Sequence, residues 1–353
     1  MNSARSPFRI QAFTDDPALR SEFLNLAERL YAGDPGHAPA TRLLETKLLD
    51  PSHPFFQTGA ETYFLAFRGD QAVARCAAIH NPALLEREPG LGLIGFFDCA
   101  EDIEAAAALL LAACLHLKKK GFRRVRAPVN RDTWHRYRIL CGGFDHPPVP
   151  MEPYNKPWYA EALETADFQK SARYRSTETA DIDGCVTRYA PYFKRCQRNG
   201  FSFRNLDMSR FEAEILDLHR ITLEIFAENH AYTPIGPDEF LELYQPLRDK
   251  IDPEFVVSAF APDGRRCGYT FAFPDARGIL HVKTVGVLPS AQGRGLSLAL
   301  LAPVYERALS RGYKAVRHCL MKSDNSSTKF DPAAKTIRQY ALYEKQLGSD
   351  PSS

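Results

Sequence analysis

Hydrophobic residues follow two different periods in the last third of the chain. The run Val282–Val287 is rich in β-branched residues and predicts a strand, which Pro289 ends because proline has no N–H for a sheet ladder. Apolar residues then recur at helical spacing and predict a helix, at Leu296, Leu300, Val304 and Ala308. Pro303 lies inside this helix, where we expect a kink or a local break. A second strand is predicted over Ala315–Met321.

Three further segments have clear helical patterns. Phe211–Glu228 has apolar residues on one face and predicts an amphipathic helix. Ala105–Leu117 is apolar throughout but too short to span a bilayer, so it predicts a buried helix. A short helix is expected at Tyr159–Thr165, after an extended connection rich in proline.

The order strand, helices, hairpin, strand, helix, strand occurs twice, about half the chain apart. The hairpin at Asp70–Ala77 matches that at Asp263–Gly268, and Gly121 matches Gly312, each starting a strand after a helix. This repeat predicts two α/β units with mixed sheets in tandem. We place the domains at residues 1–180 and 181–353.

Composition excludes several classes of protein. The chain has 353 residues, 44% hydrophobic and 25% charged, and a net charge of +2, which gives no overall attraction to nucleic acid or membrane. Its eight cysteines lack CxxC pairs or metal-ligand spacing, so we expect reduced thiols and no metal. The first residues lack the apolar run of a signal peptide, and a cytoplasmic location is expected.

A glycine-bearing turn, Gln292–Gly295, joins the predicted strand to the predicted helix. Unpaired N–H groups and the positive end of the helix dipole favour an anion there, and glycine lets a phosphate approach the backbone. Arg294 adds a planar, fork-shaped cation. The turn is therefore a candidate phosphate site.

The strand ending Val287-Leu288-Pro289, followed by Gln292-Gly293-Arg294-Gly295, resembles the acyl-CoA-binding motif of the GNAT superfamily of N-acetyltransferases. Ser297 replaces the last small residue of that motif. The resemblance implies a tandem GNAT-like fold with acyl-CoA, such as acetyl-CoA, as co-substrate. It implies that the backbone of Val285–Leu288 carries pantetheine and polarises the thioester. The residues expected to bind CoA are Val285, Val287, Leu288, Gln292, Gly293, Arg294, Gly295, Leu296, Ser297 and Asn325.

The resemblance also implies a general base and an acceptor site. His281 lies six residues before Val287, where some GNAT enzymes have a catalytic His and others a Glu. In these folds the loop after the first helix covers the acceptor, which makes Phe226, Asn229 and Tyr232 candidate substrate contacts.

Two chemical features depart from the family or stay open. The Tyr that often serves as general acid is replaced by Phe330-Asp331-Pro332, with Tyr340 and Tyr343 as distant substitutes. Cys319 is expected to pack in the core, although a thiol there could carry an acyl group.

The first copy has lost the motif. Asp98, Glu101 and Glu104 stand where Pro289, Gln292 and Gly295 stand in the second copy. Carboxylates would repel a pyrophosphate, so we expect no CoA in the first domain and a role in shaping the acceptor groove.

The segment Lys118–Arg138 is strongly basic and contains aromatic residues, which is typical of nucleic-acid-binding surfaces.

We expect an N-acyltransferase that moves a short acyl group from acyl-CoA to the amine of a small molecule, by direct attack in a ternary complex. One alternative is a FemX-like transferase using aminoacyl-tRNA, or a carrier protein, bound at Lys118–Arg138. Another is a non-catalytic acyl-CoA sensor.

Overall fold

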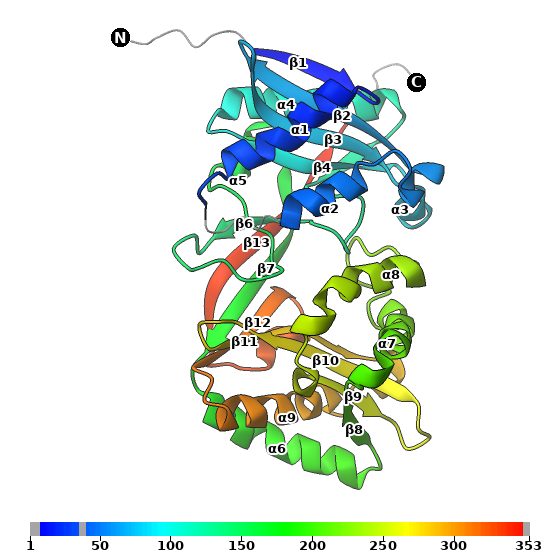
Figure 1. Cartoon of the computed structure of the whole chain (residues 1–353), viewed down its shortest axis with the longest axis vertical. Coiled ribbons are helices and arrows are strands. Elements are labelled where there is room, and N and C mark those ends of the chain that lie inside the picture. The colour runs from blue at the N-terminus through cyan, green and yellow to red at the C-terminus, as the bar shows by residue number, and fades with distance from the viewer. Residues whose placement is uncertain (1–7, 35–39, 349–353) are drawn as a thin grey trace. The chain divides into compact units, whose positions relative to one another are not determined.

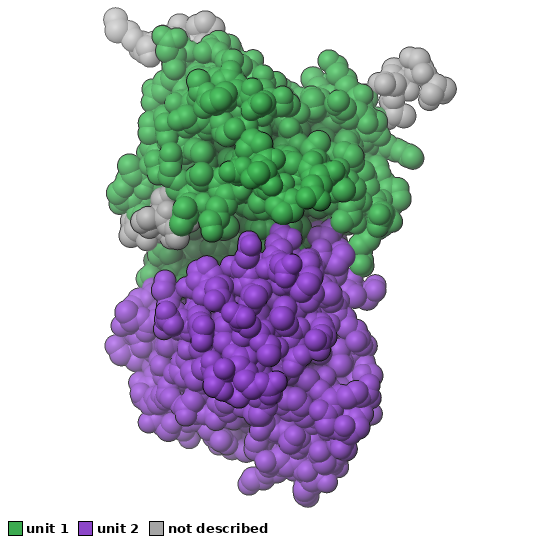
Figure 2. Space-filling view, turned by 45° about the vertical axis from the view of Figure 1, so that its right-hand side comes forward, with its two compact units in different colours: residues 1–173, 338–353 green, residues 174–337 purple. Residues whose placement is uncertain are grey.

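The computed structural model of the protein describes residues 8–34 and 40–348 (Figure 1). The chain divides into two compact units, coloured separately in Figure 2. The first unit comprises Met1–Arg173 and Arg338–Ser353, and the second comprises Tyr174–Ile337. We expected one division near residue 180, but β7 (Gln169–Thr179) and β13 (Lys335–Gln346) each begin in one unit and end in the other. Hydrophobic periodicity identifies such strands but not the unit to which each end belongs.

The first unit is a mixed sheet with helices. Its strands are ordered β1-β2-β3-β4-β5-β13, and β6 also pairs with β13. The β4–β5 pairing is parallel, and the other pairings in this unit are antiparallel. Its further elements are β1 (Phe8–Phe13), α1 (Pro17–Leu30), α2 (Ala40–Leu48), β2 (Ala60–Arg68), β3 (Gln71–His80), α3 (Pro82–Arg87), β4 (Leu91–Cys99), α4 (Ile103–Lys119), β5 (Arg124–Ala127), β6 (Ile139–Gly142) and α5 (Tyr159–Thr165).

The second unit repeats this plan. Its strands are ordered β7-β12-β11-β10-β9-β8, with β11 and β12 parallel and the others antiparallel. Its further elements are α6 (Ile182–Arg198), β8 (Ser202–Asn205), α7 (Phe211–Ile225), α8 (Pro237–Tyr244), β9 (Val256–Phe260), β10 (Arg266–Pro274), β11 (Ile279–Val287), α9 (Leu296–Ser310) and β12 (Ala315–Lys322). The predicted duplication of mixed α/β units is confirmed.

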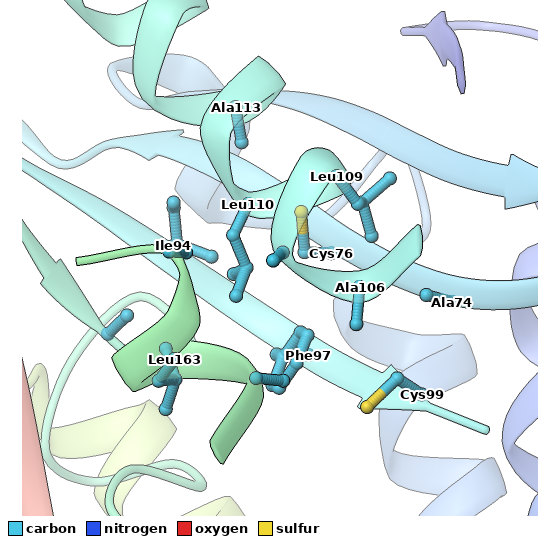
Figure 3. Packing of buried hydrophobic residues seen from close by; sticks show 14 of the residues in the cluster. Ala74, Cys76, Ile94, Phe97, Cys99, Ala106, Leu109, Leu110, Ala113 and Leu163 are labelled. Atoms are coloured by element: carbon cyan, nitrogen blue, oxygen red, sulfur yellow. The ribbon is translucent and has the colours of Figure 1, made fainter. Parts of the chain in front are cut away.

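The core of the first unit lies between α4, α5 and one face of the sheet. Figure 3 shows Leu109 and Leu110 of α4 beside Ile94 and Phe97 of β4, with Leu163 of α5 close by. The predicted apolar helix thus has its hydrophobic residues in a buried cluster, although it runs two residues longer at each end. None of the described helices is long and apolar enough to cross a bilayer.

The core of the second unit lies between its sheet and the helix pair α6 and α9. Leu296, Leu300, Val304 and Ala308 are all buried in it, as their spacing predicted. The expected break at Pro303 does not occur, because α9 runs unbroken from Leu296 to Ser310. α6 also continues through an internal proline, Pro191. Burial on the sheet outweighs the hydrogen bond that each proline removes.

Candidate functional site

Strands β11 and β12 diverge halfway along their length. In the described structure, their parallel pairing runs from Ile279 with Ala315 to Val282 with His318 and goes no further. β11 keeps its pairing with β10 as far as Val287, while β12 pairs with β7 through a register shift between His318 and Met321. The backbone beyond Val282 therefore faces a gap in the ladder where an extended ligand can pair. The expected ligand-carrying segment, Val285–Leu288, lies along this gap.

The turn after β11 opens directly into α9. Pro289–Ala291 forms a short 3₁₀ turn, and Gly295, in the left-handed region at φ 75°, is the N-cap of α9. Glycine has no side chain to cap the helix. The amides of Leu296 and Ser297 are therefore first-turn donors without an intrahelical partner. This is the arrangement that favours an anion.

The two glycines of the turn have different roles. Gly293 has φ 76°, and a Cβ there would meet nothing within 4 Å. A Cβ on Gly295 would lie 2.6 Å from atoms of both Tyr192 and Arg195 on α6. Gly295 is thus required for helix packing, whereas Gly293 leaves its backbone open to a ligand.

The other predicted CoA residues lie around this turn. The Gln292 side chain donates to the Val287 carbonyl at 3.2 Å, which ties the turn to the end of β11. Arg294 has an exposed side chain, and its carbonyl accepts from Arg195 at 3.0 Å. Leu288 donates its amide to Cys267 of β10. Asn325 follows β12 and caps a short 3₁₀ turn.

His281 is fully buried on β11 and has a partner at each ring nitrogen. Nε2 lies 3.0 Å from Oδ2 of Asp275, and Nδ1 lies 4.0 Å from the Sγ of Cys319. Its ring stacks on Phe273. Burial lowers the pKa of His281 below its usual value, an effect that Asp275 only partly offsets. The imidazole is therefore neutral near pH 7, as a base must be.

Asp275 and its surroundings were not anticipated from the sequence. Burial alone would raise the pKa of Asp275, but bonds from His281, from the Arg277 side chain and from the amides of Arg277 and Ile279 lower it to about 2. The sequence does contain one hint: Asp275 lies in the short turn between β10 and β11, and an aspartate in such a turn commonly binds backbone amides. Nothing in the spacing shows that its second oxygen reaches His281.

The three predicted acceptor residues differ in environment. Phe226 ends α7, and its ring would lie 3.4 Å from a Cβ on Gly286, which places it against β11 beside the gap. Asn229 is exposed in the following turn and donates its amide to Phe226. Tyr232 is buried, with its hydroxyl directed to the Leu223 carbonyl. Of the three, Phe226 is the one that this spacing places against the strand expected to carry the donor.

The tyrosines considered as a general acid lie elsewhere. Tyr340 and Tyr343 are on the part of β13 that belongs to the first unit, where they bind Glu152 and Glu164. Burial raises the pKa of both hydroxyls. Neither belongs to the unit that contains His281.

The first unit fills its own counterpart of the gap. β4 and β5 pair only from Leu91 with Arg124 to Leu93 with Arg126. Beyond that point the chain itself takes the free edge of β4, since Val129 donates to the Ile94 carbonyl and the Asn130 side chain accepts from the Phe96 amide at 2.7 Å. A Cβ on Gly95 would lie 2.4 Å from the Val129 carbonyl oxygen.

The N-terminus of α4 is also occupied by protein groups. Asp102 caps it by accepting from the Ala105 amide, and Arg68 binds both Asp102 and Glu104. Asp98, expected to repel a pyrophosphate, is instead fully buried between Arg75, Arg136, Tyr31 and Tyr159. Both positions that a CoA molecule would need are taken by protein groups in the first unit.

Many cations of Lys118–Arg138 are paired within the first unit. Arg124 and Arg126 bind Glu88 and Glu344, Arg131 binds Glu61, and Arg136 binds Asp98. Arg126 and Arg131 are also buried. The expected docking of tRNA or a carrier protein stays a prediction, and it gains no support from these paired side chains.

Comparisons with known proteins agree with this geometry. The family model described as Acetyltransferase (GNAT) family matches residues 211–330, from α7 through β12. The part of the second unit that contains the predicted donor site is therefore similar to GNAT acetyltransferases, as the motif from Val287 to Ser297 predicted. The solved tandem GNAT protein from the clavulanic acid biosynthesis pathway superposes with a TM-score of 0.56 at 12% identity, covering 98% of this chain and 100% of that one. A GCN5-related N-acetyltransferase from Sphaerobacter thermophilus gives 0.53 at 15% identity, with 98% of each chain covered.

A curated relative extends along nearly the whole sequence. The bacterial ceramide synthase of Caulobacter vibrioides is 28% identical over 370 residues, covering 94% of this chain and 96% of that protein. The tandem GNAT fold predicted from the sequence is thus confirmed, and the match to the GNAT family model lies within the second unit.

Proposed function

We propose that this protein is an N-acyltransferase that moves an acyl group from acyl-CoA to an amine. The observation that carries the proposal is the open edge of β11 beyond Val282, directly before the uncapped N-terminus of α9. An extended pantetheine can pair with the open edge while its pyrophosphate meets the first-turn amides.

The residues around this site have complementary roles. The amides from Gly293 to Ser297 hold the pyrophosphate, with the exposed Arg294 as an added cation. The backbone of Val285–Leu288 positions the pantetheine and polarises the thioester carbonyl. Asn325 lies after β12, on the side where the two strands separate. CoA supplies an activated thioester, and the chain supplies orientation and the transfer of a proton.

His281 is the base we assign to the second unit, because it is neutral, buried and oriented by Asp275. Direct attack by the amine in a ternary complex, as expected from the sequence, requires a ring nitrogen that faces the acceptor. Nε2 is held by Asp275, so the nitrogen available for this step is Nδ1, on the Cys319 side.

Two candidate reactions differ in the acceptor amine and in the length of the acyl chain. The sequence led us to expect a short acyl group and a small amine, with Phe226, Asn229 and Tyr232 as contacts. The relative from Caulobacter vibrioides, which matches nearly the whole chain, is named a ceramide synthase, and this name favours a long acyl chain and a lipid amine instead. Rates with acetyl-CoA and with hexadecanoyl-CoA, each offered a small amine and a long-chain amino alcohol, distinguish the two.

The first unit binds no CoA in this proposal, because Val129 and Asn130 take the edge of β4 and Asp102 caps α4. A non-catalytic acyl-CoA sensor is the alternative that shares the donor site, and it differs by showing no turnover with any amine.

The experiment that tests the proposal is calorimetric titration of the full chain with acetyl-CoA and with hexadecanoyl-CoA, beside Gly293→Asp. The carboxylate would repel a pyrophosphate, and its position is open, so we expect binding to weaken at least about tenfold. Gly264→Asp is the matched control, because Gly264 has φ 81° and open space in the β9–β10 turn. Binding unchanged in Gly293→Asp, or absent from the parent protein, would refute the donor site.

A further inference from the structure

Cys319 lies where β11 and β12 separate. It follows His318, the last residue of β12 that pairs with β11. Its Sγ is 4.0 Å from Nδ1 of His281, whose Nε2 is 3.0 Å from Asp275. A thiol on β12, an imidazole on β11 and a carboxylate in the turn before β11 are thus neighbours in sequence of contact: thiol to imidazole and imidazole to carboxylate.

The carboxylate determines which nitrogen of His281 is basic. Asp275 is ionised near neutrality and can only accept, so Nε2 must carry the imidazole proton. Nδ1 then presents its lone pair to the thiol. This is the relation of a general base to a nucleophile, with a third group orienting the base. A separation of 4.0 Å is longer than a hydrogen bond, but such contacts commonly shorten when substrate is bound.

A second observation indicates an oxygen-bearing ligand beside this thiol. Arg317 lies two residues before Cys319 on β12, near enough to His281 for its charge to lower the pKa of that imidazole, and only 3% of its surface is exposed. Its Nε donates to Glu178, but among the described residues its buried Nη1 has no partner. A buried donor left unpaired costs about 1–3 kcal/mol, so an oxygen supplied by a ligand would satisfy it.

Two other cysteines of this unit are bound to backbone carbonyls. Cys267 donates its thiol proton to the Ala259 carbonyl, and Cys196 donates to the Arg294 carbonyl. Each is engaged with a backbone acceptor, as structural cysteines commonly are. At Cys319 a neutral imidazole also faces the thiol and can take up its proton.

From this geometry we infer that Cys319 accepts the acyl group covalently before the amine receives it. The inference rests on the proposed function, but it replaces the direct attack expected from the sequence with a transfer in two steps. In the first step, Sγ forms a bond to the acyl carbon, the bond from that carbon to the CoA sulfur breaks, and the thiol proton passes through His281 to the departing CoA thiolate. In the second, the amine nitrogen bonds to the acyl carbon, the bond to Sγ breaks, and an amine proton returns through His281 to Cys319.

Asp275 acts as a positioning residue in this scheme, and Arg317 Nη1 is placed to donate to the acyl oxygen. One thioester replaces another in the first step, so its equilibrium constant is near unity. The acyl-protein therefore accumulates when acyl-CoA is in excess and no amine is present.

The test uses the full chain with acetyl-CoA and with hexadecanoyl-CoA, without an acceptor. We expect intact-mass measurement to show one acyl group per chain, located on Cys319 by peptide mapping and removed by neutral hydroxylamine. Labelled free CoA should exchange into the acyl-CoA pool. Cys319→Ser should lose both signals while still binding CoA. Cys141→Ser is the control, because Cys141 is the described cysteine that is not buried and would be acylated first by non-specific chemistry.

The base and its positioning residue give separate readouts. His281→Asn should slow acylation by about a hundredfold or more. The charged and thiol groups facing His281 are Asp275, Arg277, Arg317 and Cys319. Because the Asp275 charge raises the pKa of His281, Asp275→Asn should move the acid limb of the acylation rate to lower pH as well as lower the rate.

Two outcomes would contradict the covalent intermediate on Cys319 but would leave the proposed function standing. One is amide formation by Cys319→Ser at the parent rate. The other is a parent protein that binds CoA and forms amide but shows neither adduct nor CoA exchange. Failure to bind either acyl-CoA would instead refute the proposed function itself.

Discussion

The side chain of Asn130 accepts a hydrogen bond from the amide of Phe96 at 2.7 Å, at the point where β4 of the first unit has left its parallel partner. In the second unit, the ladder between β11 and β12 ends at Val282 among the described residues. A single loop after β5 therefore separates a unit that pairs this edge with its own chain from one in which we propose that a pantetheine arm pairs.

Asn130→Ala should remove this bond and leave the Phe96 amide buried without its acceptor. We expect the free energy of unfolding of the first unit to fall by about 1–3 kcal/mol. Urea denaturation followed by tryptophan fluorescence reports on this unit, because both tryptophans lie in it. CoA stoichiometry should stay at one per chain; a second equivalent bound by the variant or by the parent would contradict the assignment of the first unit.

Asp98→Ala should leave the buried cation of Arg75 without its closest partner. Two guanidinium nitrogens of Arg75 lie 2.9 and 2.5 Å from Asp98, and the side chains of both residues are fully buried. Removing one partner of such a pair typically costs about 3–5 kcal/mol. Asp15→Asn, at the exposed pair with Arg20, is the control and should change stability by about 1 kcal/mol or less. Equal effects of the two substitutions would show that burial of the Asp98 pair is unimportant.

Gly295→Ala and Gly293→Ala should separate packing from backbone strain. Both glycines have positive φ, so each alanine carries a cost of about 1–2 kcal/mol. Only at Gly295 does the new Cβ also meet Tyr192 and Arg195, which should add about 1–3 kcal/mol. Chemical denaturation of the two variants should therefore show the larger loss at Gly295. A larger loss at Gly293 would mean that the turn has another conformation.

The stability of the second unit should fall as the pH drops below about 6.5. Burial lowers the pKa of His318 to about 4, against 6.5 for an unperturbed histidine. Between these values the unfolded chain takes up a proton that the folded chain does not, so folding loses free energy as the pH falls through this window. The full effect is roughly 3 kcal/mol below pH 4 and is absent above 6.5.

Hydrogen exchange of β12 peptides measured between pH 7 and pH 4.5, with correction for intrinsic exchange, should detect this loss. His318→Gln keeps an acceptor for the Tyr305 hydroxyl, 2.7 Å away in the parent protein, and should flatten the dependence. An equally steep dependence in that variant would assign the effect to other groups, such as His281, whose pKa is also lowered by burial.

Much of the architecture followed from local sequence. The periods of the hydrophobic residues placed α4, α5, α9 and β11 to within a few residues, and the internal repeat predicted two similar units. The motif from Val287 to Ser297 predicted a donor site and the resemblance to the GNAT family, because strand, turn glycines and helix start are adjacent in the chain. The unbroken course of α9 through Pro303 was not predictable, since tertiary burial decides whether a helix continues past a proline.

The sequence by itself determined the elements, their duplication and the loop that we propose to bind a phosphate, since each depends on residues close together in the chain. Only the tertiary structure decided where β7 and β13 change units, which cations of Lys118–Arg138 are paired, and that Asp275 and Cys319 meet at the two nitrogens of His281. These relations join residues on separate strands and turns. Their distances depend on how the strands pair and where the ladder stops, which no local pattern of side chains specifies.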